Sequence, residues 1–211
     1  MFVEEALWIR DLFDELGPRS GTVIDLGSST EEYRRLVQPH IDYHVFRPLR
    51  QKGVTVVHVD AKPAAGVDVV IDLTRASLDG VLSPADAVIA TSLLEHVTDR
   101  DLLVRHITGL TLPGGLAIVS VPRVYPFHPD PIDTMYRPTQ RELEELWRRD
   151  FDVLRSETLY VEKWGRPMPL VVRMINRALR AIGRPAFRRS QLVIVALRRR
   201  GSVSTTPPSD G

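Results

Sequence analysis

Residues 21–35 read GTVIDLGSSTEEYRR, a pattern typical of a strand, a tight turn and a helix N-terminus in succession. The β-branched run Thr22–Ile24 ends in Asp25, the turn falls at Gly27, and the following Ser-Ser-Thr begins a helix. Glycine permits the positive φ and the close backbone approach that such a turn needs. Ser29 and Glu32 fit a capping box. Because unpaired N–H groups gather at such a junction, we expect it to hold a carboxylate or phosphate.

The spacing of glycines after this turn narrows the choice of ligand. Neither G-x-G-x-x-G nor G-K-[ST] follows Gly27, so dinucleotide binding and P-loop phosphate binding are both disfavoured. A nicotinamide-dependent reductase would use the same kind of crevice. This chain lacks the glycine fingerprint of such an enzyme, so a reductase is the least favoured of the functions considered.

Apolar strand-like runs alternate with helical runs along the rest of the chain. Strands are predicted at VTVVHVD, at VDVVID, near residues 87–90 and at LAIVSVP closed by Pro122, with LPGG as a turn. Helices are predicted at residues 2–17, with Val3, Leu7, Leu12 and Leu16 buried, at EEYRRLVQ up to Pro39, and at DRDLLVRHITGLT. This alternation predicts an α/β fold with a doubly wound, mostly parallel sheet and helices on both faces.

Residues 148–200 complete the predicted domain. RELEELWRR reads as a helix, FDVLRSETLYVE as a strand, residues 169–183 as a helical stretch and QLVIVALRR as a last strand, which predicts an antiparallel edge. We therefore expect a single domain over residues 1–200, with its core at 20–147. The polar, proline-containing residues 201–211 predict a disordered tail.

Composition excludes several classes of protein. The chain has 211 residues, 28 basic against 27 acidic, so net charge does not imply a nucleic-acid partner. The absence of cysteine excludes disulfides, thiolate metal sites and cysteine nucleophiles, and no cluster of metal ligands is evident in the sequence. The N-terminus is not a signal peptide, and no apolar run approaches the roughly 18 residues of a membrane span, so we expect a soluble cytoplasmic protein.

Five sequence elements in register resemble the class I S-adenosylmethionine-dependent methyltransferases. They are IDLGSS, VVHVD, VDVVIDLT, DAVIATSLLEHV and LPGGLAIVSVP, and the likeness covers roughly Thr22 to Trp147. The run SVPRVYPFHPDPIDTMYRPT looks like the small bacterial type-11 branch, whose loop after this strand has a similar Tyr-Pro, His, Asp and Arg-Pro-Thr pattern. The resemblance implies a Rossmann-like sheet, S-adenosyl-L-methionine as cofactor and methyl transfer as the reaction.

Carried over position by position, the resemblance implies a set of cofactor-binding residues. Asp60 would accept hydrogen bonds from the ribose hydroxyls, for which an ionised carboxylate is suited. The turn would adjoin the methionine part, Asp72 and Leu73 the adenine, and the end of the next strand the sulfonium. The full set is Asp25, Gly27, Ser28, Ser29, Asp60, Asp72, Leu73, Thr91 and Ser92. In the alternative, Asp60 and Asp72 only cap the turns that follow them.

Two features depart from the family pattern. Ser29 replaces the usual second glycine of the first motif, which narrows the room for the methionine part. In addition, 35 positions separate Asp25 from Asp60, against about 20 in related nucleotide folds. Either QPHIDYHVFRPLRQKG is an insertion, or DYHVFRP is the second strand and Arg47 replaces the ribose acid. We prefer Asp60, because an arginine cannot accept a hydrogen bond from a diol.

The proline-rich loop VYPFHPDPIDTMYRPT, predicted to leave the same edge of the sheet, carries the candidates for the methyl acceptor. His128 and His96 are the candidate general bases for a hydroxyl acceptor, since histidine takes up a proton near neutral pH. Glu95-His96 can equally be an ordinary helix start. Candidate substrate residues on the loop are Tyr125, Asp130, Asp133, Tyr136 and Arg137.

The expected acceptor is a small molecule or a glycan-linked group, with O-methylation favoured over N-methylation. There is no Asn/Asp-Pro-Pro-aromatic signature for the exocyclic amines of nucleic acids. The alternative function is a catalytically weak or inactive binding or assembly protein with the methyltransferase fold.

Residues 171–184 show the pattern of a basic amphipathic helix. Advancing about 100° per residue, Val171, Ile175 and Leu179 share one face while Arg173 and Arg180 share the opposite one. Such a helix can pack its apolar face on the sheet, or it can contact an anionic acceptor or a membrane surface. The oligomeric state is left open by the sequence.

Overall fold

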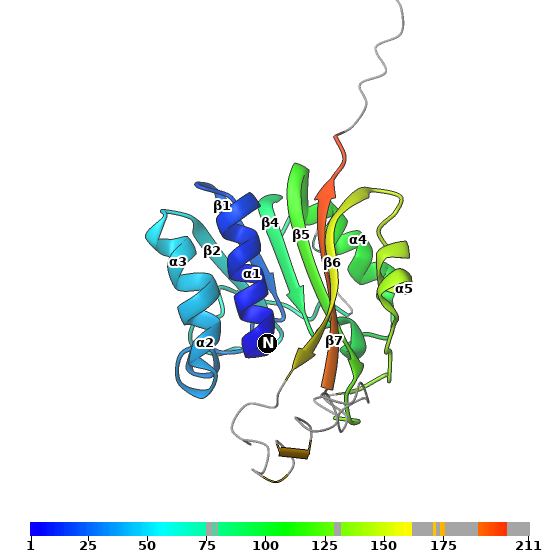
Figure 1. The fold of residues 1–211 in the computed structure, drawn as a ribbon. Helices are drawn as coiled ribbons and strands as arrows, with labels where there is room; N and C mark the ends of the chain where they lie inside the picture. Colours follow the sequence, from blue (N-terminus) through cyan, green and yellow to red (C-terminus); the bar gives the residue numbers. More distant parts are fainter. Residues whose placement is uncertain are drawn as a thin grey trace, which may run out of the picture.

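A computed structural model of the chain describes residues 1–74, 78, 80–128, 132–161, 171, 174–175 and 190–201. Its described part contains one sheet with the strand order β3-β2-β1-β4-β5-β7-β6 (Figure 1). The strands are β1 (Thr22–Leu26), β2 (Thr55–Asp60), β3 (Val69–Val70), β4 (Ala85–Thr91), β5 (Thr111–Val124), β6 (Phe151–Val161) and β7 (Ser190–Arg199). Pairing is parallel from β3 to β5, and β7 is antiparallel to both neighbours. The predicted fold class is confirmed.

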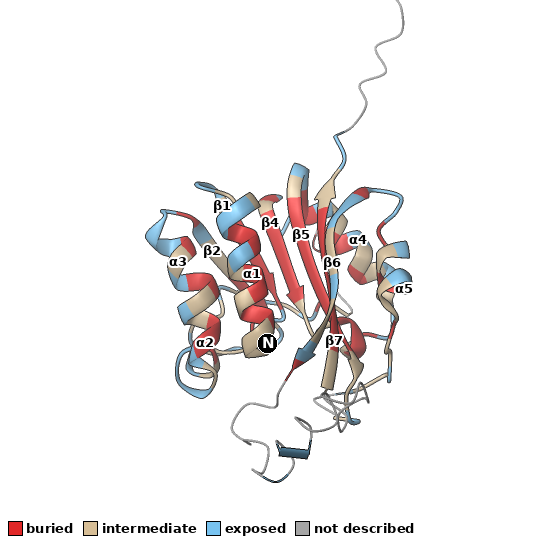
Figure 2. Cartoon of the chain, viewed as in Figure 1, coloured by how far each residue is buried: buried red, intermediate tan, exposed pale blue. Residues whose placement is uncertain are grey.

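Helices cover both faces of this sheet (Figure 1). They are α1 (Val3–Leu16), α2 (Pro39–Ile41), α3 (Arg47–Gln51), α4 (Arg100–Leu110) and α5 (Gln140–Glu145). One apolar core packs α1, α2 and α3 against the sheet, and a second packs α4 and the region of α5 against its other face. The central strands are therefore buried on both sides (Figure 2), as apolar parallel strands require.

The segment between β1 and β2, which was hardest to place from the sequence, is helical. The chain passes through the π-helical turn η1 (Tyr33–Val37), α2, the π-helical turn η2 (Asp42–Phe46) and α3. The helical turn before Pro39 ends at Val37, as predicted, and Pro39 itself begins α2, where its missing N–H leaves no donor unpaired. The alternative that made DYHVFRP the second strand is wrong, and Asp60 ends the second strand.

Strand β5 is longer at both ends than the sequence predicts. Thr111 pairs with Ala85 and Leu116 with Ala87, so LPGG forms a bulge within the strand rather than a turn before it. A Cβ on Gly115 would lie 2.9 Å from the Asp86 carbonyl oxygen, which explains the glycine. Pro122 does not close the strand. It lies beside a register shift in the β5–β7 pairing, a position where sheets accept proline.

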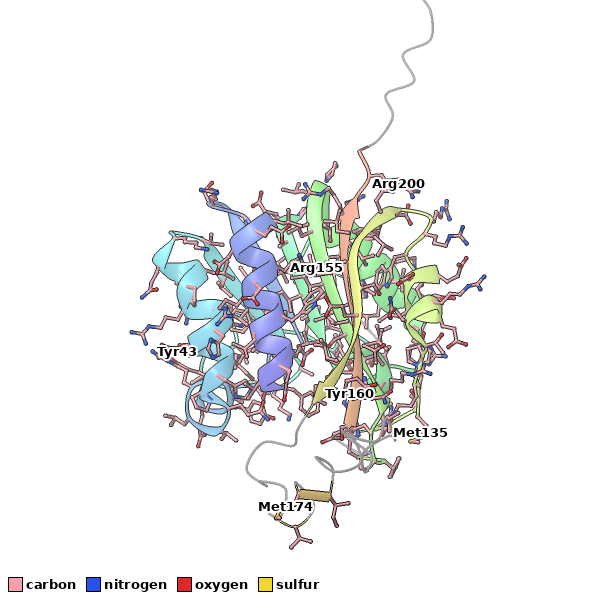
Figure 3. All side chains as sticks on the ribbon, in the orientation of Figure 1. Tyr43, Met135, Arg155, Tyr160, Met174 and Arg200 are labelled. Atoms are coloured by element: carbon pink, nitrogen blue, oxygen red, sulfur yellow. The ribbon has the colours of Figure 1, made fainter. Side chains whose placement is uncertain are left out.

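Helix α1 forms as predicted but buries a different face. The buried residues are Glu5, Ala6, Trp8, Ile9, Leu12 and Phe13, so of the four apolar residues expected inside only Leu12 is fully buried. Arg155 of β6 reaches over to α1 (Figure 3), with its guanidinium 2.6 Å from the Glu15 carboxylate and 5.8 Å from the Trp8 ring centroid. The N-terminal helix is thus fastened to the far edge of the sheet.

Two predictions concern segments that are largely outside the described residues. The tail at 202–211 is one of them. The other is the basic amphipathic helix at 171–184, of which only Val171, Met174 and Ile175 are described, and all three are exposed. Among the described helices, none has the length and apolar character needed to cross a bilayer.

Candidate active site

The carboxyl ends of the parallel strands carry the polar residues that the sequence singled out. Asp25, at the end of β1, is only 4% exposed, and its carboxylate lies 2.9 Å from Nδ1 of His58 on the neighbouring strand β2. The ring of Phe46 meets the His58 ring edge to face at 4.7 Å. Asp25 therefore already has a buried partner within the sheet.

The turn after β1 has the backbone geometry expected of it, with φ +75° at Gly27 and φ +57° at Ser29. Its N–H groups, however, already donate hydrogen bonds to other atoms of the chain. Those of Gly27 and Ser28 donate to the Val59 carbonyl at 2.9 and 3.0 Å, and that of Ser29 donates to an Asp60 carboxylate oxygen at 2.7 Å. The expectation of an open anion-binding turn is therefore not met by this geometry.

The helix that follows is capped by Thr30 rather than by Ser29. The Thr30 hydroxyl accepts from the Tyr33 N–H at 3.1 Å, because the left-handed backbone at Ser29 moves the helix start one residue on. Arg34 then reaches back under the turn and donates to the carbonyls of Ser28 and Ser29 at 2.9 and 2.7 Å. Burial lowers the pKa of this guanidinium from its ordinary value. The turn is thus held from below by a buried arginine.

Asp60 and Asp72 follow β2 and β3, and each accepts hydrogen bonds from the turn beside it. Asp60 accepts from the N–H groups of Ser29 at 2.7 Å and Lys62 at 3.0 Å. Asp72 accepts from the N–H and hydroxyl of Thr74 at 2.9 and 2.6 Å. The capping interpretation is thus realised in geometry at both positions. A carboxylate offers about four lone-pair sites, so two N–H bonds at Asp60 leave capacity for a diol. Leu73 is buried in the sheet core.

Thr91 ends β4, and Ser92 directly after it has an unusual backbone. Its φ of +48° is rare for a residue other than glycine. The Ser92 N–H donates to both the carbonyl and the hydroxyl of Ser120 on β5, at 3.0 and 3.1 Å. The Ser92 hydroxyl itself is buried and has no hydrogen-bond partner among the described residues. A strained residue with an unpaired buried hydroxyl is typical of a ligand-binding position.

Helix α1 delivers an acidic residue to the same place. Glu5 is completely buried and accepts from the Ser120 hydroxyl and, at 2.9 Å, from the Phe2 N–H. Both carboxylate oxygens thus have partners. The sequence analysis missed Glu5 and Ser120, since both lie within an apolar pattern that read as ordinary helix and strand.

Glu95 lies in the one-turn 3₁₀-helix η3 (Leu94–His96) after β4 and is also completely buried. Within the part of the chain that the structure describes, neither of its carboxylate oxygens is hydrogen-bonded to another residue. The pKa of Glu95 is raised to about 8, mainly by burial; its own backbone N–H and Arg137 lower it, whereas Glu5 and Asp133 contribute to the rise. A carboxyl group in this state marks a functional-site candidate. From the sequence alone, this role and an ordinary helix start were equally open.

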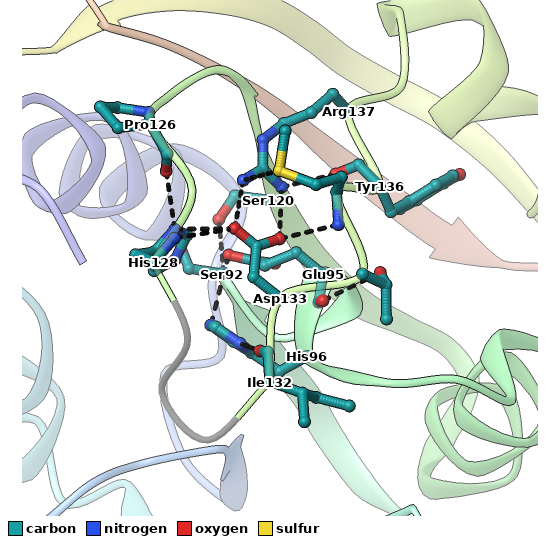
Figure 4. A network of polar contacts seen from close by, with 12 residues as sticks. Ser92, Glu95, His96, Ser120, Pro126, His128, Ile132, Asp133, Tyr136 and Arg137 are labelled. Atoms are coloured by element: carbon teal, nitrogen blue, oxygen red, sulfur yellow. Dashed lines mark hydrogen bonds and ion pairs between the residues drawn. The ribbon is translucent and has the colours of Figure 1, made fainter.

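The loop after β5 is ordered around Asp133, whose side chain is fully buried (Figure 4). Arg137 donates to both of its oxygens at 3.1 and 2.6 Å, and the N–H groups of Met135 and His128 donate at 2.9 and 3.1 Å. Burial raises the pKa of Asp133, but the Arg137 and backbone hydrogen bonds outweigh it and hold the pKa at about 2. Asp133 and Arg137 thus build the loop, whatever contact either makes with a substrate.

The same loop folds onto η3 and brings both candidate bases together. Thr134 donates its N–H and its hydroxyl to the Glu95 carbonyl at 2.8 and 3.0 Å, and His96 Nδ1 is hydrogen-bonded to the Ile132 carbonyl. The rings of His96 and His128 meet edge to face at 5.2 Å. Residues 32 positions apart in sequence therefore share one site.

Aromatic side chains line this region on two sides. Tyr125 meets His128 at 5.0 Å and Phe2 of the N-terminus at 5.7 Å, both edge to face. Tyr136 lies beneath the Arg100 guanidinium at 4.5 Å. Burial raises the pKa of both tyrosines. Tyr125 is the one beside the histidines, and its role as a wall of the acceptor site stays a prediction; Asp130 lies outside the described residues.

A sheet in which five parallel strands in the order 3-2-1-4-5 continue into antiparallel β7 and then β6, with helices on both faces, is the fold of the class I S-adenosylmethionine-dependent methyltransferases. Polar groups at the strand ends, with a loop from β5 folded over them, define a candidate active site on that fold.

Solved structures of low sequence identity share this fold. One is the 1,6-didemethyltoxoflavin-N1-methyltransferase of Burkholderia thailandensis with bound 1,6-didemethyltoxoflavin and S-adenosylhomocysteine (TM-score 0.58, 16% identity, covering 93% of this chain and 79% of that one). Others are the N-methyltransferase NodS of Bradyrhizobium japonicum (0.56, 7%, 94% and 96%) and an S-adenosylmethionine-dependent methyltransferase of Mesorhizobium loti (0.52, 18%, 92% and 98%). No family model and no curated protein matches the sequence.

Proposed function

We propose that this protein transfers a methyl group from S-adenosyl-L-methionine to a hydroxyl group of a small-molecule or glycan-type acceptor. The observation that carries the proposal is the position of Asp60 at the carboxyl end of β2, directly beside the glycine turn of β1. That is where class I methyltransferases need a carboxylate for the ribose.

The residues at the strand ends suit this cofactor. Its sulfonium and ammonium groups are cationic, and the strand ends present carboxylates and carbonyls. Asp60 would hold the ribose hydroxyls, and Asp72 with Leu73 would adjoin the adenine. Ser92, with Thr91 beside it, would lie near the sulfonium. The Ser92 hydroxyl would supply a polar group there, since it has no hydrogen-bond partner among the described residues. The remaining contacts, to the methionine part, would come from Asp25, Gly27, Ser28 and Ser29.

S-adenosyl-L-methionine, when bound, supplies a methyl group already activated by the sulfonium, so the protein mainly aligns the acceptor and removes a proton. His128 is the proposed proton acceptor. Its Nδ1 lies 3.1 Å from both the Pro126 carbonyl and an Asp133 oxygen, so Nδ1 carries the hydrogen and Nε2 can take a proton. His96 lies beside it as the second candidate base.

Contacts to the acceptor are proposed for the loop after β5. Tyr125 would form an aromatic wall, and Tyr136 and Arg137 would contribute polar groups. Asp130 is included in this proposal on the ground of the sequence alone. The arginine face proposed at 171–184 would add contact with an anionic acceptor or membrane surface. Flotation with anionic liposomes at low salt tests that contact, and a protein that stays unbound removes it.

The experiment that tests cofactor binding is calorimetric titration of the whole chain with S-adenosyl-L-methionine. We expect micromolar affinity for the wild type and loss of binding in Asp60→Ala. Asp152→Ala is the matched control, since Asp152 is an exposed aspartate paired with Arg200 on the antiparallel part of the sheet. Because Asp60 also holds the Ser29 N–H, unfolding temperatures of all three proteins must be compared. A wild type that binds no cofactor contradicts the proposal.

One observation favours a second function: the N–H groups of the turn after β1 already donate hydrogen bonds within the chain. Such a turn suits a protein that keeps the fold as a binding or assembly module. That function predicts cofactor binding without turnover across a broad panel of hydroxyl and amine acceptors, or no binding at all. Methyl transfer from labelled cofactor to any acceptor in the panel excludes it.

A further inference from the structure

Three side chains of metal-binding type converge at the end of β4. A carboxylate oxygen of Glu95 and one ring nitrogen each of His96 and His128 all lie within 4.8 Å of one another. The first two residues come from η3, and the third comes from the loop that folds back over it (Figure 4). The cluster exists only in the folded chain, which is why the sequence analysis found no set of metal ligands.

Glu95 is the member that points to a ligand. It is 0% exposed, and both of its carboxylate oxygens are buried without a hydrogen-bond partner among the side chains and backbone groups of the other described residues. A buried polar group without a partner destabilises the folded protein. Nearly all such groups in native proteins are paired with protein, water or an ion. His96 Nε2 lies 3.8 Å from one of these oxygens, so an imidazole nitrogen faces the carboxylate.

Both histidines are held in the orientation that metal ligands adopt. His96 Nδ1 bonds to the Ile132 carbonyl, and His128 Nδ1 lies 3.1 Å from the Pro126 carbonyl and from the Asp133 carboxylate. Metal-bound histidines usually donate their other N–H to a carbonyl or carboxylate in this way. Each bond places the hydrogen on Nδ1, so the Nε2 lone pair of each ring is left for a cation. Arg137 fixes Asp133 in turn.

We propose that Glu95, His96 and His128 form a binding site for a first-row divalent transition-metal ion of the zinc class, and that this ion holds a hydroxyl oxygen of the acceptor. Two imidazoles and one carboxylate match zinc, iron(II) or manganese better than the all-oxygen sites of calcium. Zinc–ligand distances of about 2.0–2.2 Å place ligand atoms roughly 3.4 Å apart. Side-chain movements of about an ångström would therefore bring the three ligand atoms to these separations.

Three protein ligands leave coordination positions open, as in catalytic rather than structural zinc sites. The open side would receive a hydroxyl group and lower its pKa. The O–H bond would then break with its electron pair left on the oxygen, and the proton would pass to water. In this arrangement the histidines hold the cation and need not act as bases. The part of the proposal that concerns the acceptor rests on the proposed function, whereas the binding of the cation does not.

The test is calorimetric titration of the whole chain, stripped with a chelator and free of any histidine tag, with Zn²⁺ and separately with Mn²⁺. We expect one ion per chain for Zn²⁺, and at least about tenfold weaker binding in Glu95→Gln and in His128→Asn. His44→Asn is the matched control, because His44 lies in η2 between β1 and β2 and takes no part in the cluster. It should bind as the wild type does.

Because a change at a buried residue can prevent folding, Co²⁺ binding to the wild type provides a second measurement. Visible d–d bands of a low-coordinate nitrogen and oxygen site, displaced by Zn²⁺, support the proposal. A wild type without such bands and without stoichiometric Zn²⁺ binding overturns it, as does Zn²⁺ binding that both cluster variants keep at the strength of the wild type. Titration with S-adenosylhomocysteine in chelator is run in parallel, so that failure of the metal site and failure of cofactor binding are told apart.

Discussion

Ser29 shows how one residue both supports and weakens the proposed cofactor site. It stands where the family has glycine, and its φ of +57° is a conformation in which glycine is unstrained. The sequence identified the substitution, but it could not show that the Ser29 N–H is donated to Asp60. That bond depends on residues 31 positions apart, which no local pattern encodes.

Replacing Ser29 by glycine tests this strain directly. Glycine removes the strain of the left-handed backbone, but it also gives the unfolded chain more freedom, and these two effects oppose each other. We therefore expect the free energy of unfolding of Ser29→Gly to lie within about 0.5 kcal/mol of the wild type. Ser28→Gly is the neighbouring control: Ser28 has no positive φ and loses its hydroxyl bond to Ser29, so about 1 kcal/mol should be lost. Urea unfolding measures both. Equal losses at the two positions would argue against a strained Ser29.

At the scale of the element, helix α1 connects the N-terminus to the candidate site. Its helical period was predictable, because apolar residues recur every three to four positions. Its buried face was not, since the packing turns Glu5 toward Ser120 of β5 and leaves Leu7 and Leu16 at the margin. From the sequence alone, an acidic residue in an amphipathic helix is expected to face the solvent. Only the structure shows the partner that makes burial of such a residue possible.

Glu5→Ala should destabilise the protein substantially. The change leaves the Ser120 hydroxyl and the Phe2 N–H without their acceptor in a buried position, and we expect a loss of about 2–3 kcal/mol of unfolding free energy. Asp11→Ala on the same helix removes only a surface pair with Arg10, and should cost less than about 1 kcal/mol. Thermal and urea unfolding of both variants give the comparison. A Glu5 variant as stable as the Asp11 variant would contradict the buried contact.

At the scale of the whole molecule, the mostly parallel sheet, its antiparallel edge and the two helical layers were predictable from the alternation of apolar strands and helices, whereas the strand order came from the structure. The segment 33–51 and the bulged start of β5 did not, because π-helical turns and a four-residue bulge leave no periodic signal. The rim residues were found from the sequence as strand ends. The position of His128 beside Glu95 and His96 was not found, because it depends on the loop after β5, whose proline-rich composition predicts only that it is neither helix nor central strand.

The crystal structure of the protein with S-adenosylhomocysteine tests the central claim most directly. We predict the adenosyl group beyond the carboxyl ends of β1, β2 and β4, with the ribose hydroxyls on Asp60 and the sulfur on the side of Ser92 and Glu95. An adenosyl group bound elsewhere, or crystals that show no ligand there at saturating concentration, would contradict the account.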